Sequence, residues 1–587
     1  MLNQPGSSQA YTVYSLLSER ARNLGSKSAY TFLKNGEGEE RSVTYGQLDL
    51  EARALAVRIL RDAEPGDRAL VLADDNDNFV RAFMACQYAG VIAVPVCPPV
   101  PIQSERRVAG LRAIASDCAA ALVLSSGTAE IREVAPELAA RSWIAVDEVG
   151  TDLAADFRPV SIDPDDLSFL QYTSGSTSSP KGVMVTHRSL MFNEELFSHC
   201  FSLSRDDVIV SWLPLYHDMG LIGMVLQTLH LGAHAVLMSP LSFIQRPARW
   251  LRALTRYRGT MTGAPNFAYE LCLRRIPPQD RAEFDLSSLH CAFSGAEPIN
   301  AAIMVSFADG YRASGLDRNA MAAGYGLAEV TLVASASAPG AFPPCVRVQA
   351  EALRRGKVTA GNDRTLVSVG RPQLHRRVEV VDPVTHEPCA DGNVGEIWLS
   401  GPDVAVGYWR RPDETARIFG AHLAGSGDGP FLRTGDTGVR YRGELFVTGR
   451  LKDLIIVGGL NHYPQDIELT VESAHEWIRP GFTAVFAREP SDGRNAGQEQ
   501  VVAVAEVQRP RNRSGEMPGR EDLALSVRTA VSLAHGIQLH DILLVVAGAV
   551  PRTTSGKIQR TACRDYYERS ELVLARLPAA RELKDMP

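Results

Sequence analysis

The sequence predicts an α/β protein with a large N-terminal domain, residues 1–451, and a small α+β C-terminal domain, residues 452–587. Three observations lead to this prediction. From about residue 12 to residue 325, helical patterns alternate with short apolar runs, as in layered α/β folds. Beyond residue 367 the pattern changes to short strands separated by turns. The last segment, of roughly 135 residues, has the length of an independent small domain.

The first part of the chain contains apolar runs that fit buried strands. Residues 69–72 (ALVL), 120–124 (AALVL) and 235–238 (AVLM) are continuous apolar stretches, which is typical of strands covered on both faces. Residues 45–61 fit one of the helices between such strands. This part is therefore expected to form mainly parallel sheets with helices on their faces.

The later part of the chain is richer in strands. Residues 377–381 (RVEVV), 395–400 (GEIWLS) and 444–447 (ELFV) predict a small β-rich subdomain. Residues 449–453 (GRLKD) then lead into the last domain, in which 500–505 (QVVAVA) and 542–546 (ILLVV) are expected core strands.

Composition excludes several classes of protein. The net charge of −7 gives no overall basic field for binding nucleic acid. Nine cysteines are scattered without a C-x-x-C pair, which is typical of a reduced chain. The first residues lack a basic segment followed by an apolar run, and no apolar run is long enough to span a membrane. We expect a cytoplasmic protein with no membrane span.

The most informative segment is residues 172–182 (YTSGSTSSPKG). Small residues let the backbone approach an anion, hydroxyl and N–H groups donate to its oxygens, and Lys181 supplies charge. Strand patterns at 167–172 and 182–186 flank the loop, so it predicts a phosphate cradle within a hairpin. It is not a Walker A loop, because Pro180 stands where the second glycine would be. The alternative is a solvated Ser/Gly turn.

Two glycine-containing motifs could hold a nucleotide base. Residues 294–298 (SGAEP) follow an expected strand and precede an expected helix, so a flat ring could lie on this corner. In residues 324–331 (GYGLAEVT), Tyr325 could stack on a purine, and Glu329 could bind Mg²⁺ carried by a polyphosphate. Taken alone, Tyr325 fits a core position and Glu329 a charge on a helix surface.

Two further motifs carry single charged residues. In residues 433–436 (RTGD), Asp436 suits the two vicinal hydroxyls of a ribose, and the alternative is an Asx turn. In residues 551–558 (PRTTSGKI), Lys557 follows a glycine in the last domain. A lone lysine of this kind is usually a surface charge, so its interest depends on the other motifs.

Together and in this order, these motifs resemble those of the ANL superfamily of adenylate-forming enzymes, over nearly the whole chain. Residues 212–223 (WLPLYHDMGLIG), 263–269 (GAPNFAY) and 461–468 (NHYPQDIE) make the chain most similar to fatty acyl-AMP ligases. Adenylation domains of peptide synthetases carry at the first of these positions an aspartate that holds an amino group. One departure from the superfamily is Ser178-Ser179, where a glycine is common in the cradle.

The resemblance implies two α/β subdomains and a β-rich subdomain in the N-terminal domain, followed by a mobile C-terminal domain. It implies that a fatty acid attacks ATP in the presence of Mg²⁺, giving acyl-AMP and pyrophosphate. The acyl group then passes to the phosphopantetheine arm of a separate acyl carrier protein or carrier domain. A carboxylate is ionised at pH 7, so no general base is required. One alternative is a fatty acyl-CoA synthetase. Another is an inactive nucleotide-binding scaffold, which would have no need of all the charged motif residues.

The resemblance also assigns roles to individual residues. The catalytic set is Lys557, which would bridge the carboxylate and the α-phosphate, with Lys181, Glu329 and His217. Lys452 stands at the hinge position, and residues 343–366 resemble an insertion that separates acyl-AMP ligases from acyl-CoA synthetases. The predicted acyl tunnel, which could equally be plain core, comprises Trp212, Leu221, Ile222, Gly223, Met261 and Phe267. The predicted nucleotide-binding set comprises Thr173, Ser174, Gly175, Ser176, Thr177, Lys181, Gly295, Ala296, Glu297, Gly324, Tyr325, Gly326, Leu327, Ala328, Asp436 and Arg450.

Overall fold

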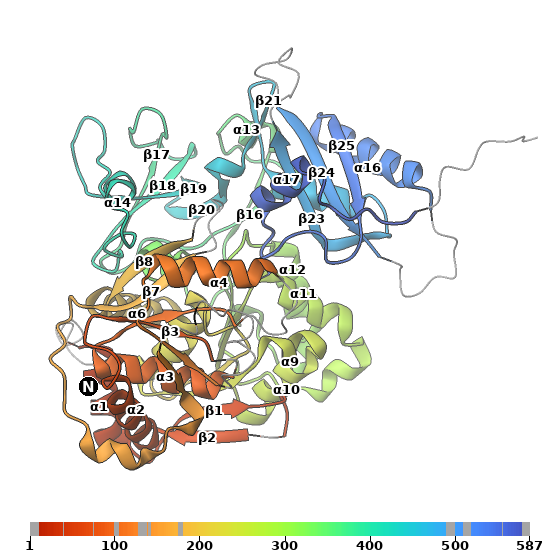
Figure 1. The fold of residues 1–587 in the computed structure, drawn as a ribbon. Coiled ribbons are helices and arrows are strands. Elements are labelled where there is room, and N and C mark those ends of the chain that lie inside the picture. Colours follow the sequence, from red (N-terminus) through yellow and green to blue (C-terminus); the bar gives the residue numbers. More distant parts are fainter. Residues whose placement is uncertain are drawn as a thin grey trace, which may run out of the picture.

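The structure is a computed structural model, and it has the predicted α/β class (Figure 1). A large N-terminal body contains two mixed sheets and a smaller antiparallel one, and a small α+β unit follows it. The residues that the structure describes are 11–38, 40–73, 75–98, 105–126, 138, 142–173, 180–488, 499–508, 518–553 and 556–577.

The first mixed sheet has six strands in the order β6-β5-β3-β4-β7-β8. Its strands pair in parallel except for β7 and β8, which form the antiparallel hairpin predicted around the cradle. Helices α2 (Tyr45–Ile59), α3 (Asn76–Ala89) and α4 (Glu105–Asp117) belong to this part of the chain. The strands are β3 (Arg68–Val71), β4 (Ile92–Pro95), β5 (Leu122–Ser125), β6 (Ser142–Ala145), β7 (Leu167–Thr173) and β8 (Lys181–Thr186).

The second mixed sheet has eight strands in the order β14-β13-β12-β11-β9-β10-β1-β2. Its inner pairs are parallel, and both outermost pairs are antiparallel. The strands are β1 (Ser28–Leu33), β2 (Glu40–Thr44), β9 (Val208–Ser211), β10 (His234–Met238), β11 (Met261–Ala264), β12 (Cys291–Ser294), β13 (Met321–Gly326) and β14 (Val333–Ala336). The helices are α1 (Val13–Leu24), α6 (His187–Phe201), α7 (Asp218–Gly220), α8 (Gln227–Leu231), α9 (Pro240–Gln245), α10 (Ala248–Tyr257), α11 (Asn266–Arg275) and α12 (Ala301–Gly310).

Helix α6 ties the cradle hairpin to the core between these sheets. It begins directly after β8, because Thr186 is its N-cap and forms a reciprocal capping box with Ser189. Its apolar side chains, such as Phe197, belong to one apolar cluster that also contains Val71 of β3 and Trp250 of α10. The end of the cradle is therefore anchored to the most extensively packed region of the protein.

A β-rich subdomain follows, as predicted, with an antiparallel sheet in the order β17-β18-β19-β20. Its strands are β17 (Arg377–Val381), β18 (Val394–Ser400), β19 (Leu432–Tyr441) and β20 (Glu444–Arg450), and helix α14 spans Pro412–Phe419. The expected insertion at 343–366 covers β15 (Cys345–Val348), helix α13 (Ala350–Arg354) and all but the last residue of β16 (Arg364–Val367), which pairs with β15.

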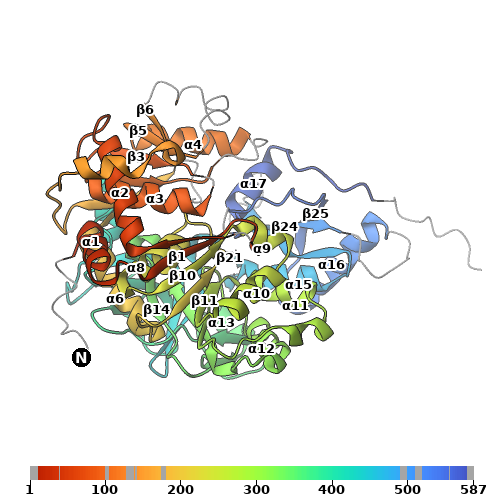
Figure 2. The same ribbon diagram turned by 90° about the horizontal axis from the view of Figure 1, so that it is seen from below.

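The C-terminal domain lies against one side of the large body in both ribbon views (Figures 1 and 2). Its main sheet has β24 between β23 and β25, antiparallel to the first and parallel to the second. One apolar cluster on each face of this sheet gives the domain a core of its own. Its elements are β21 (Ile455–Val457), β22 (Leu460–His462), α15 (Pro464–Ser473), β23 (Ile478–Arg488), β24 (Gln500–Val507), α16 (Arg520–His535), β25 (Leu539–Val545) and α17 (Arg560–Glu568).

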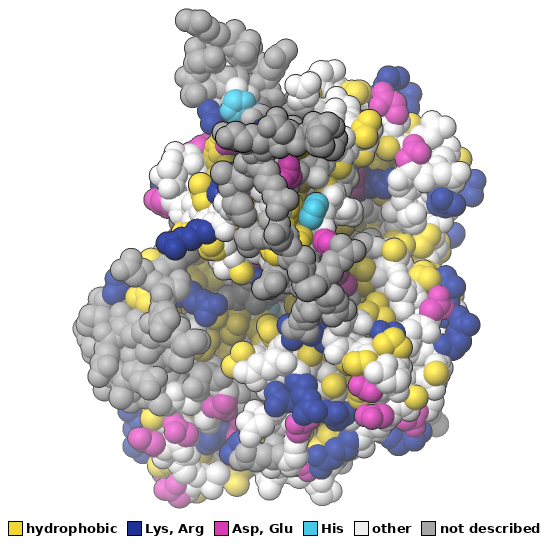
Figure 3. Space-filling view, turned by 90° about the vertical axis from the view of Figure 1, so that its right-hand side faces the viewer, with side chains coloured by type: hydrophobic (Ala, Val, Ile, Leu, Met, Phe, Trp, Pro, Cys, Tyr) yellow, Lys and Arg dark blue, Asp and Glu magenta, His cyan; other side chains and the backbone are white. Residues whose placement is uncertain are grey.

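The described surface is mixed in charge. Figure 3 shows basic and acidic side chains interspersed over the face that it draws. Among the described residues, none of the helices is both long and apolar enough to cross a bilayer.

Candidate active site

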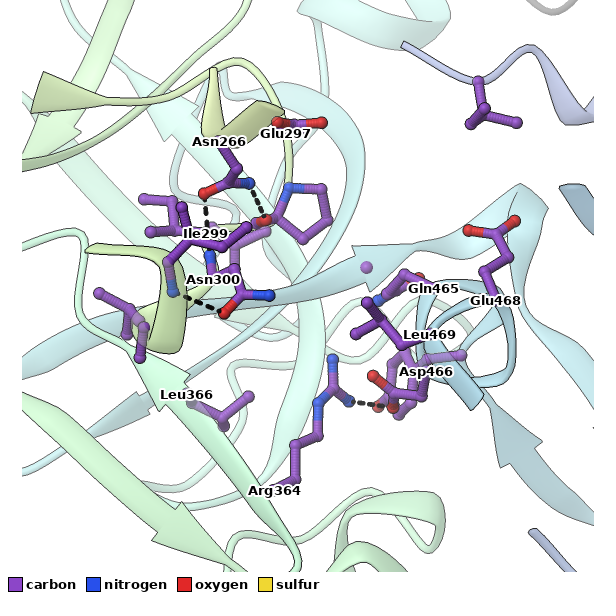
Figure 4. Close-up of a pocket in the computed structure, with 18 of the residues that line it drawn as sticks. Asn266, Glu297, Ile299, Asn300, Arg364, Leu366, Gln465, Asp466, Glu468 and Leu469 are labelled. Atoms are coloured by element: carbon purple, nitrogen blue, oxygen red, sulfur yellow. Dashed lines mark hydrogen bonds and ion pairs between the residues drawn. The ribbon is translucent and has the colours of Figure 1, made fainter. Parts of the chain in front are cut away.

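A cavity of about 1000 Å³ opens between the N-terminal and C-terminal domains (Figure 4). Elements that are distant in sequence line it, including β13, β16, β19, α11, α15 and the loop that carries Lys557. The cavity brings together nine of the predicted site residues, which are Phe267, Ala296, Glu297, Gly324, Tyr325, Gly326, Asp436, Arg450 and Lys557.

Asp436 is held from two sides at the edge of this cavity. Its carboxylate accepts a hydrogen bond of 2.8 Å from the Tyr325 hydroxyl and one of 2.7 Å from Arg450 Nε. The turn before it needs Gly435, which has φ of +70°. Burial and the Asp436 carboxylate raise the pKa of Tyr325 well above its usual value, so the hydroxyl remains a donor. The Asp436 carboxylate therefore bonds distant side chains, an arrangement different from the Asx-turn alternative.

Lys557 lies on a tight hairpin of the C-terminal domain. Arg552 and Ile558 pair across it, and the Thr553 N–H donates to the Lys557 carbonyl at 2.8 Å. Gly556 permits the turn with φ of +90°. Burial lowers the pKa of Lys557, and the nearby Asp218 carboxylate is the strongest influence that raises it again.

His217 and Asp218 belong to the surroundings of Lys557. Burial lowers the pKa of His217 to about 4, against the opposing influence of Asp218. The imidazole is therefore neutral at pH 7 and adds no positive charge beside Lys557.

The cradle is described only at its two ends. Thr173 ends β7 and Lys181 begins β8, whereas Ser174, Gly175, Ser176 and Thr177 lie outside the described residues. Lys181 forms an ion pair with Glu414 of α14, and its Nζ lies 5.5 Å from the centre of the Tyr408 ring.

The segment 403–415 packs along the cradle hairpin. The Trp409 N–H donates to the Gly182 carbonyl at 2.8 Å, and the Met184 N–H donates to the Gly407 carbonyl at 2.9 Å. Within this segment, the Tyr408 hydroxyl donates to Glu329 Oε1 at 2.8 Å. Tyr408 thus contacts both the lysine of the cradle and the carboxylate expected to bind Mg²⁺.

Glu329 precedes a strained turn. Thr331 has φ of +71° and ψ of −63°, and the Leu332 N–H donates across it to the Val330 carbonyl at 2.9 Å, which makes a γ-turn of positive φ. A conformation of this kind costs on the order of 1–3 kcal/mol for a residue that is not glycine. The Thr331 hydroxyl offsets part of this cost by donating to the Asp403 carbonyl at 2.8 Å.

A buried polar network supports the same turn. The Asn193 side chain donates to the carbonyls of Val330 and Val333 at 3.0 and 2.9 Å and to the Asp403 carboxylate at 2.8 Å. Asp403 also pairs with Arg376, and both side chains are fully buried. Because breaking a buried ion pair is costly, this network holds the Glu329 segment in one conformation.

Sequence reasoning did not identify Tyr408, Glu414, Asp403 or Asn193. Residues 407–415 (GYWRRPDET) carry a local signal, but it predicts only a helix that starts at Pro412 with acidic residues in its first turn. Lys181 and Glu414 are 233 positions apart, so their pairing has no local signature.

Comparison with known proteins decides the family. A family model described as "AMP-binding enzyme" matches residues 17–409, and one described as "Disco-interacting protein 2-like, AMP domain" matches residues 452–576. The chain belongs to the AMP-binding enzyme family. The predicted adenylate-forming class of ATP-dependent ligase is thereby confirmed.

Relatives of this AMP-binding enzyme span almost its full length. A medium-chain-fatty-acid–[acyl-carrier-protein] ligase, JamA of Moorena producens, is 40% identical over 94% of each chain. A long-chain-fatty-acid–AMP ligase, FadD32 of Mycobacterium marinum, is 34% identical over 93% of this chain and 92% of the relative. A solved fatty acyl-adenylate ligase from L. pneumophila, in complex with acyl adenylate and pyrophosphate, is 35% identical with a TM-score of 0.75, covering 96% of this chain and 97% of that one. The predicted resemblance to fatty acyl-AMP ligases is confirmed.

The remaining nucleotide-site predictions of this AMP-binding enzyme lie around the cavity. Gly295 packs so closely on β13 that a Cβ there would stand 3.1 Å from the Gly324 carbonyl oxygen. Leu327 and Ala328 are buried beside Glu329. Their roles in holding adenine stay predictions.

The expected tunnel residues are buried except for Phe267, which is partly buried. Trp212 stacks on Phe243 with 4.1 Å between ring centres and meets the Phe267 ring edge-on at 5.9 Å. Leu221, Ile222 and Gly223 belong to a π-helix, Leu221–Leu226, an element often found at functional sites, and Met261 lies in β11. Tunnel lining and plain core are both buried, so the tunnel stays a prediction.

The hinge and insertion residues lie at the boundary between the domains. Lys452 lies in a single 3₁₀ turn, Leu451–Asp453, directly after β20. From the insertion, Arg364 pairs with Asp466 of α15 at 3.0 Å and lies 4.6 Å from the centre of the Tyr463 ring (Figure 4). Arg354 donates to the Ala534 carbonyl at 3.3 Å. The insertion thus contacts the C-terminal domain from two positions.

Glu329 suits a cation that arrives with its substrate. Mg²⁺ is commonly held by one or two carboxylates together with phosphate oxygens and water. One Glu329 oxygen is bound by Tyr408, which orients the carboxylate. Among the described residues, no group of three or more His, Cys, Asp or Glu side chains could hold a metal ion without such help.

Proposed function

We propose that this enzyme activates a fatty acid with ATP and passes the acyl group to the phosphopantetheine arm of a separate acyl carrier protein or carrier domain. The relatives named above support the substrate class and the acceptor. The observation that carries the proposal is the cavity between the domains, in which the Glu297 corner, Tyr325, Asp436 and Lys557 converge from four sequence motifs.

The first half-reaction needs positioning more than proton transfer. The fatty carboxylate attacks the α-phosphorus of ATP, the bond between the α-phosphorus and the bridging oxygen breaks, and pyrophosphate leaves with that oxygen. Both reactants are anions, so catalysis rests on orientation and on neutralising charge. Lys557 would bridge the carboxylate and the α-phosphate. His217 would be neutral and would add no positive charge beside Lys557.

The resemblance to fatty acyl-AMP ligases supports the remaining roles. Asp436 and Arg450 would hold the ribose, and Tyr325 with the corner at Gly295, Ala296 and Glu297 would hold adenine. Lys181 and the cradle would hold the β- and γ-phosphates. Glu329 would hold Mg²⁺, which supplies charge neutralisation on the polyphosphate.

The insertion favours an acyl-AMP ligase over an acyl-CoA synthetase. Its contacts through Arg364 and Arg354 hold the C-terminal domain from the side, which would limit rotation about Lys452. The C-terminal domain must rotate after adenylate formation before CoA can reach the acyl group. Restricting this rotation would therefore hinder acyl-CoA formation and leave adenylate formation intact.

Two measurements test the proposal. ATP–pyrophosphate exchange across fatty acids of different chain length should show activity, and its absence at every length would favour the scaffold alternative. Chromatography of radiolabelled products with CoA present should show acyl-AMP from the intact enzyme. Replacing residues 343–366 by a short Gly/Ser link should retain exchange and permit some acyl-CoA formation. Abundant acyl-CoA from the intact enzyme would establish the synthetase alternative instead.

Three points stay predictions from the sequence. The bounds 1–451 and 452–587 place the hinge at Lys452. The acceptor is expected on a separate chain. Action in the cytoplasm is expected from the scattered cysteines, and those in the described residues are all free thiols.

A further inference from the structure

The hairpin that carries Lys557 also carries a second cation, Arg552, at its opposite end. The two ends are joined by the Arg552–Ile558 bridge and by the hydrogen bond of 2.9 Å from the Lys557 N–H to the Thr553 hydroxyl. Arg552 and Lys557 therefore move as one unit. Any contact that fixes Arg552 against the N-terminal domain also fixes the position of Lys557.

Phe267 of the N-terminal domain is the surface on which this hairpin rests. A Cβ at Gly556 would lie 3.1 Å from Phe267 Cε1, which is close contact. The guanidinium carbon of Arg552 lies 5.8 Å from the centre of the Phe267 ring and 4.3 Å from that of Phe482. The Arg552 guanidinium is thus near Phe482 of its own domain and Phe267 of the N-terminal domain, and both distances suit cation–π attraction.

Glu297 supplies an opposite charge to the same place. Glu297 Oε1 and Arg552 Nε are both buried without a hydrogen-bond partner, and both residues line the cavity between the domains. Burial raises the pKa of Glu297, and Arg552 is the strongest influence that lowers it. Burial in turn lowers the pKa of Arg552, and Glu297 is the strongest influence that raises it. Each group thus stabilises the charge of the other across the domain boundary.

The corner that carries Glu297 is rigid. The Asn266 side chain donates to the Pro298 carbonyl at 2.8 Å and accepts from the Asn300 N–H at 3.0 Å, as Figure 4 shows. Asn266 directly precedes Phe267 at the start of α11. The ring and the carboxylate are therefore presented to the hairpin from one braced element.

Other charges near Arg552 come from its own domain. Arg479 pairs with the buried Glu506 at 2.7 Å, and Glu472 of α15 adds a carboxylate. These groups travel with Arg552 whenever the C-terminal domain moves, so they do not distinguish one domain pose from another. Glu297 and Phe267 do distinguish them, because they belong to the N-terminal domain.

We propose that Phe267, Glu297 and Arg552 form an interdomain contact that holds the Lys557 hairpin in the pose for adenylate formation. All three are positioning residues in this role, since they act by placing Lys557. The inference rests on the proposed function in one respect, namely that acyl transfer to the carrier uses a different domain pose. The contact should therefore matter for the first half-reaction and not for the second.

The test separates the two half-reactions in the full-length enzyme. Arg552→Gln should slow acyl-AMP formation roughly 10- to 100-fold, because a small displacement of a catalytic group has effects of that order. Transfer from supplied acyl-AMP to a carrier protein should stay within about twofold of the unmodified enzyme. Glu297→Gln should also slow acyl-AMP formation, and combining the two changes should cost no more than the larger one alone.

Control variants separate the loss of this contact from a general effect of removing a charge or lowering stability. Arg569→Gln removes an exposed arginine from the same domain and should leave both half-reactions unchanged. If Arg552→Gln melts at a lower temperature, Arg552→Lys, which keeps the charge but loses the planar guanidinium, replaces it. An equal loss in both half-reactions, or additive effects of Glu297→Gln and Arg552→Gln, would overturn the interdomain contact. If the unmodified enzyme forms no adenylate from any fatty acid, the proposed function fails instead.

Discussion

Removing the carboxylate of Asp436 should weaken ATP binding with little effect on the chemical step. The carboxylate accepts from Tyr325 and Arg450 at 2.8 and 2.7 Å, so its position is set before a nucleotide arrives. Its side chain is only 6% exposed, whereas that of Arg450 is 49% exposed. Solvent therefore screens Arg450 more than the carboxylate, and Asp436 is expected to provide most of the contact with the ribose.

The magnitude follows from the chemistry of the contact. A hydrogen bond to a charged group contributes about 1.5–3 kcal/mol. Because 1.4 kcal/mol is a factor of ten, Asp436→Ala should raise the KM for ATP roughly 10- to 100-fold. The ribose contact is made in the ground state as well as in the transition state, so kcat should stay within about twofold.

Kinetics of ATP–pyrophosphate exchange measure this, with 2′- and 3′-deoxyATP as probes. The unmodified enzyme should discriminate against at least one deoxy analogue by about tenfold, and Asp436→Ala should lose that discrimination. Asp428→Asn is a matched control, because Asp428 pairs with Arg377 on the exposed surface of the same subdomain. A fall in kcat with an unchanged KM, or retained discrimination in Asp436→Ala, would refute the ribose role.

Three further outcomes are expected. Lys557→Ala should nearly abolish adenylate formation at saturating substrates, since losing such a charge contact costs ~3 kcal/mol or more. ATP binding measured by calorimetry should stay close to normal. Unchanged turnover would contradict the role of Lys557. Tyr408→Phe removes the hydrogen bond to Glu329 and should raise the Mg²⁺ concentration for half-maximal exchange several-fold, whereas an identical Mg²⁺ titration would count against that orienting role. Burial raises the pKa of Glu472 to about 7, above its unfolded value, so its ionisation costs stability progressively as the pH rises from about 4.5 through 7. Glu472→Gln should therefore raise the melting temperature at pH 8 and change it little at pH 5, and equal shifts at both pH values would exclude this linkage.

Local sequence patterns predict much of the fold. The apolar runs at 69–72, 120–124 and 235–238 overlap β3, β5 and β10, because strands buried on both faces need continuous apolar side chains. The hairpin around the cradle likewise coincides with β7 and β8.

Long-range pairings in the site left no comparable pattern. The contact of Tyr408 with Glu329 joins residues 79 positions apart, and that of Asn193 with Asp403 joins residues 210 positions apart. Such pairs depend on how subdomains pack, and a single sequence records no register between subdomains. The strained turn at Thr331 could not be predicted from the sequence for the same reason. Threonine disfavours positive φ, and only its tertiary partners hold it in this conformation.

The hydrogen bond between Tyr325 and Asp436 crosses from the large mixed sheet to the β-rich subdomain. A nucleotide held by both would add a link between two blocks that already share one apolar cluster, in which Tyr325 and Ala334 pack with Val378 and Ile397. Ligands that bind only the folded state add RT ln(1 + [L]/Kd) to its stability, and here the gain would be shared by both blocks. In scanning calorimetry a non-hydrolysable acyl-adenylate mimic should therefore sharpen the endotherm as well as shift it upwards. The substrate itself then becomes part of what makes the N-terminal domain melt as one cooperative unit.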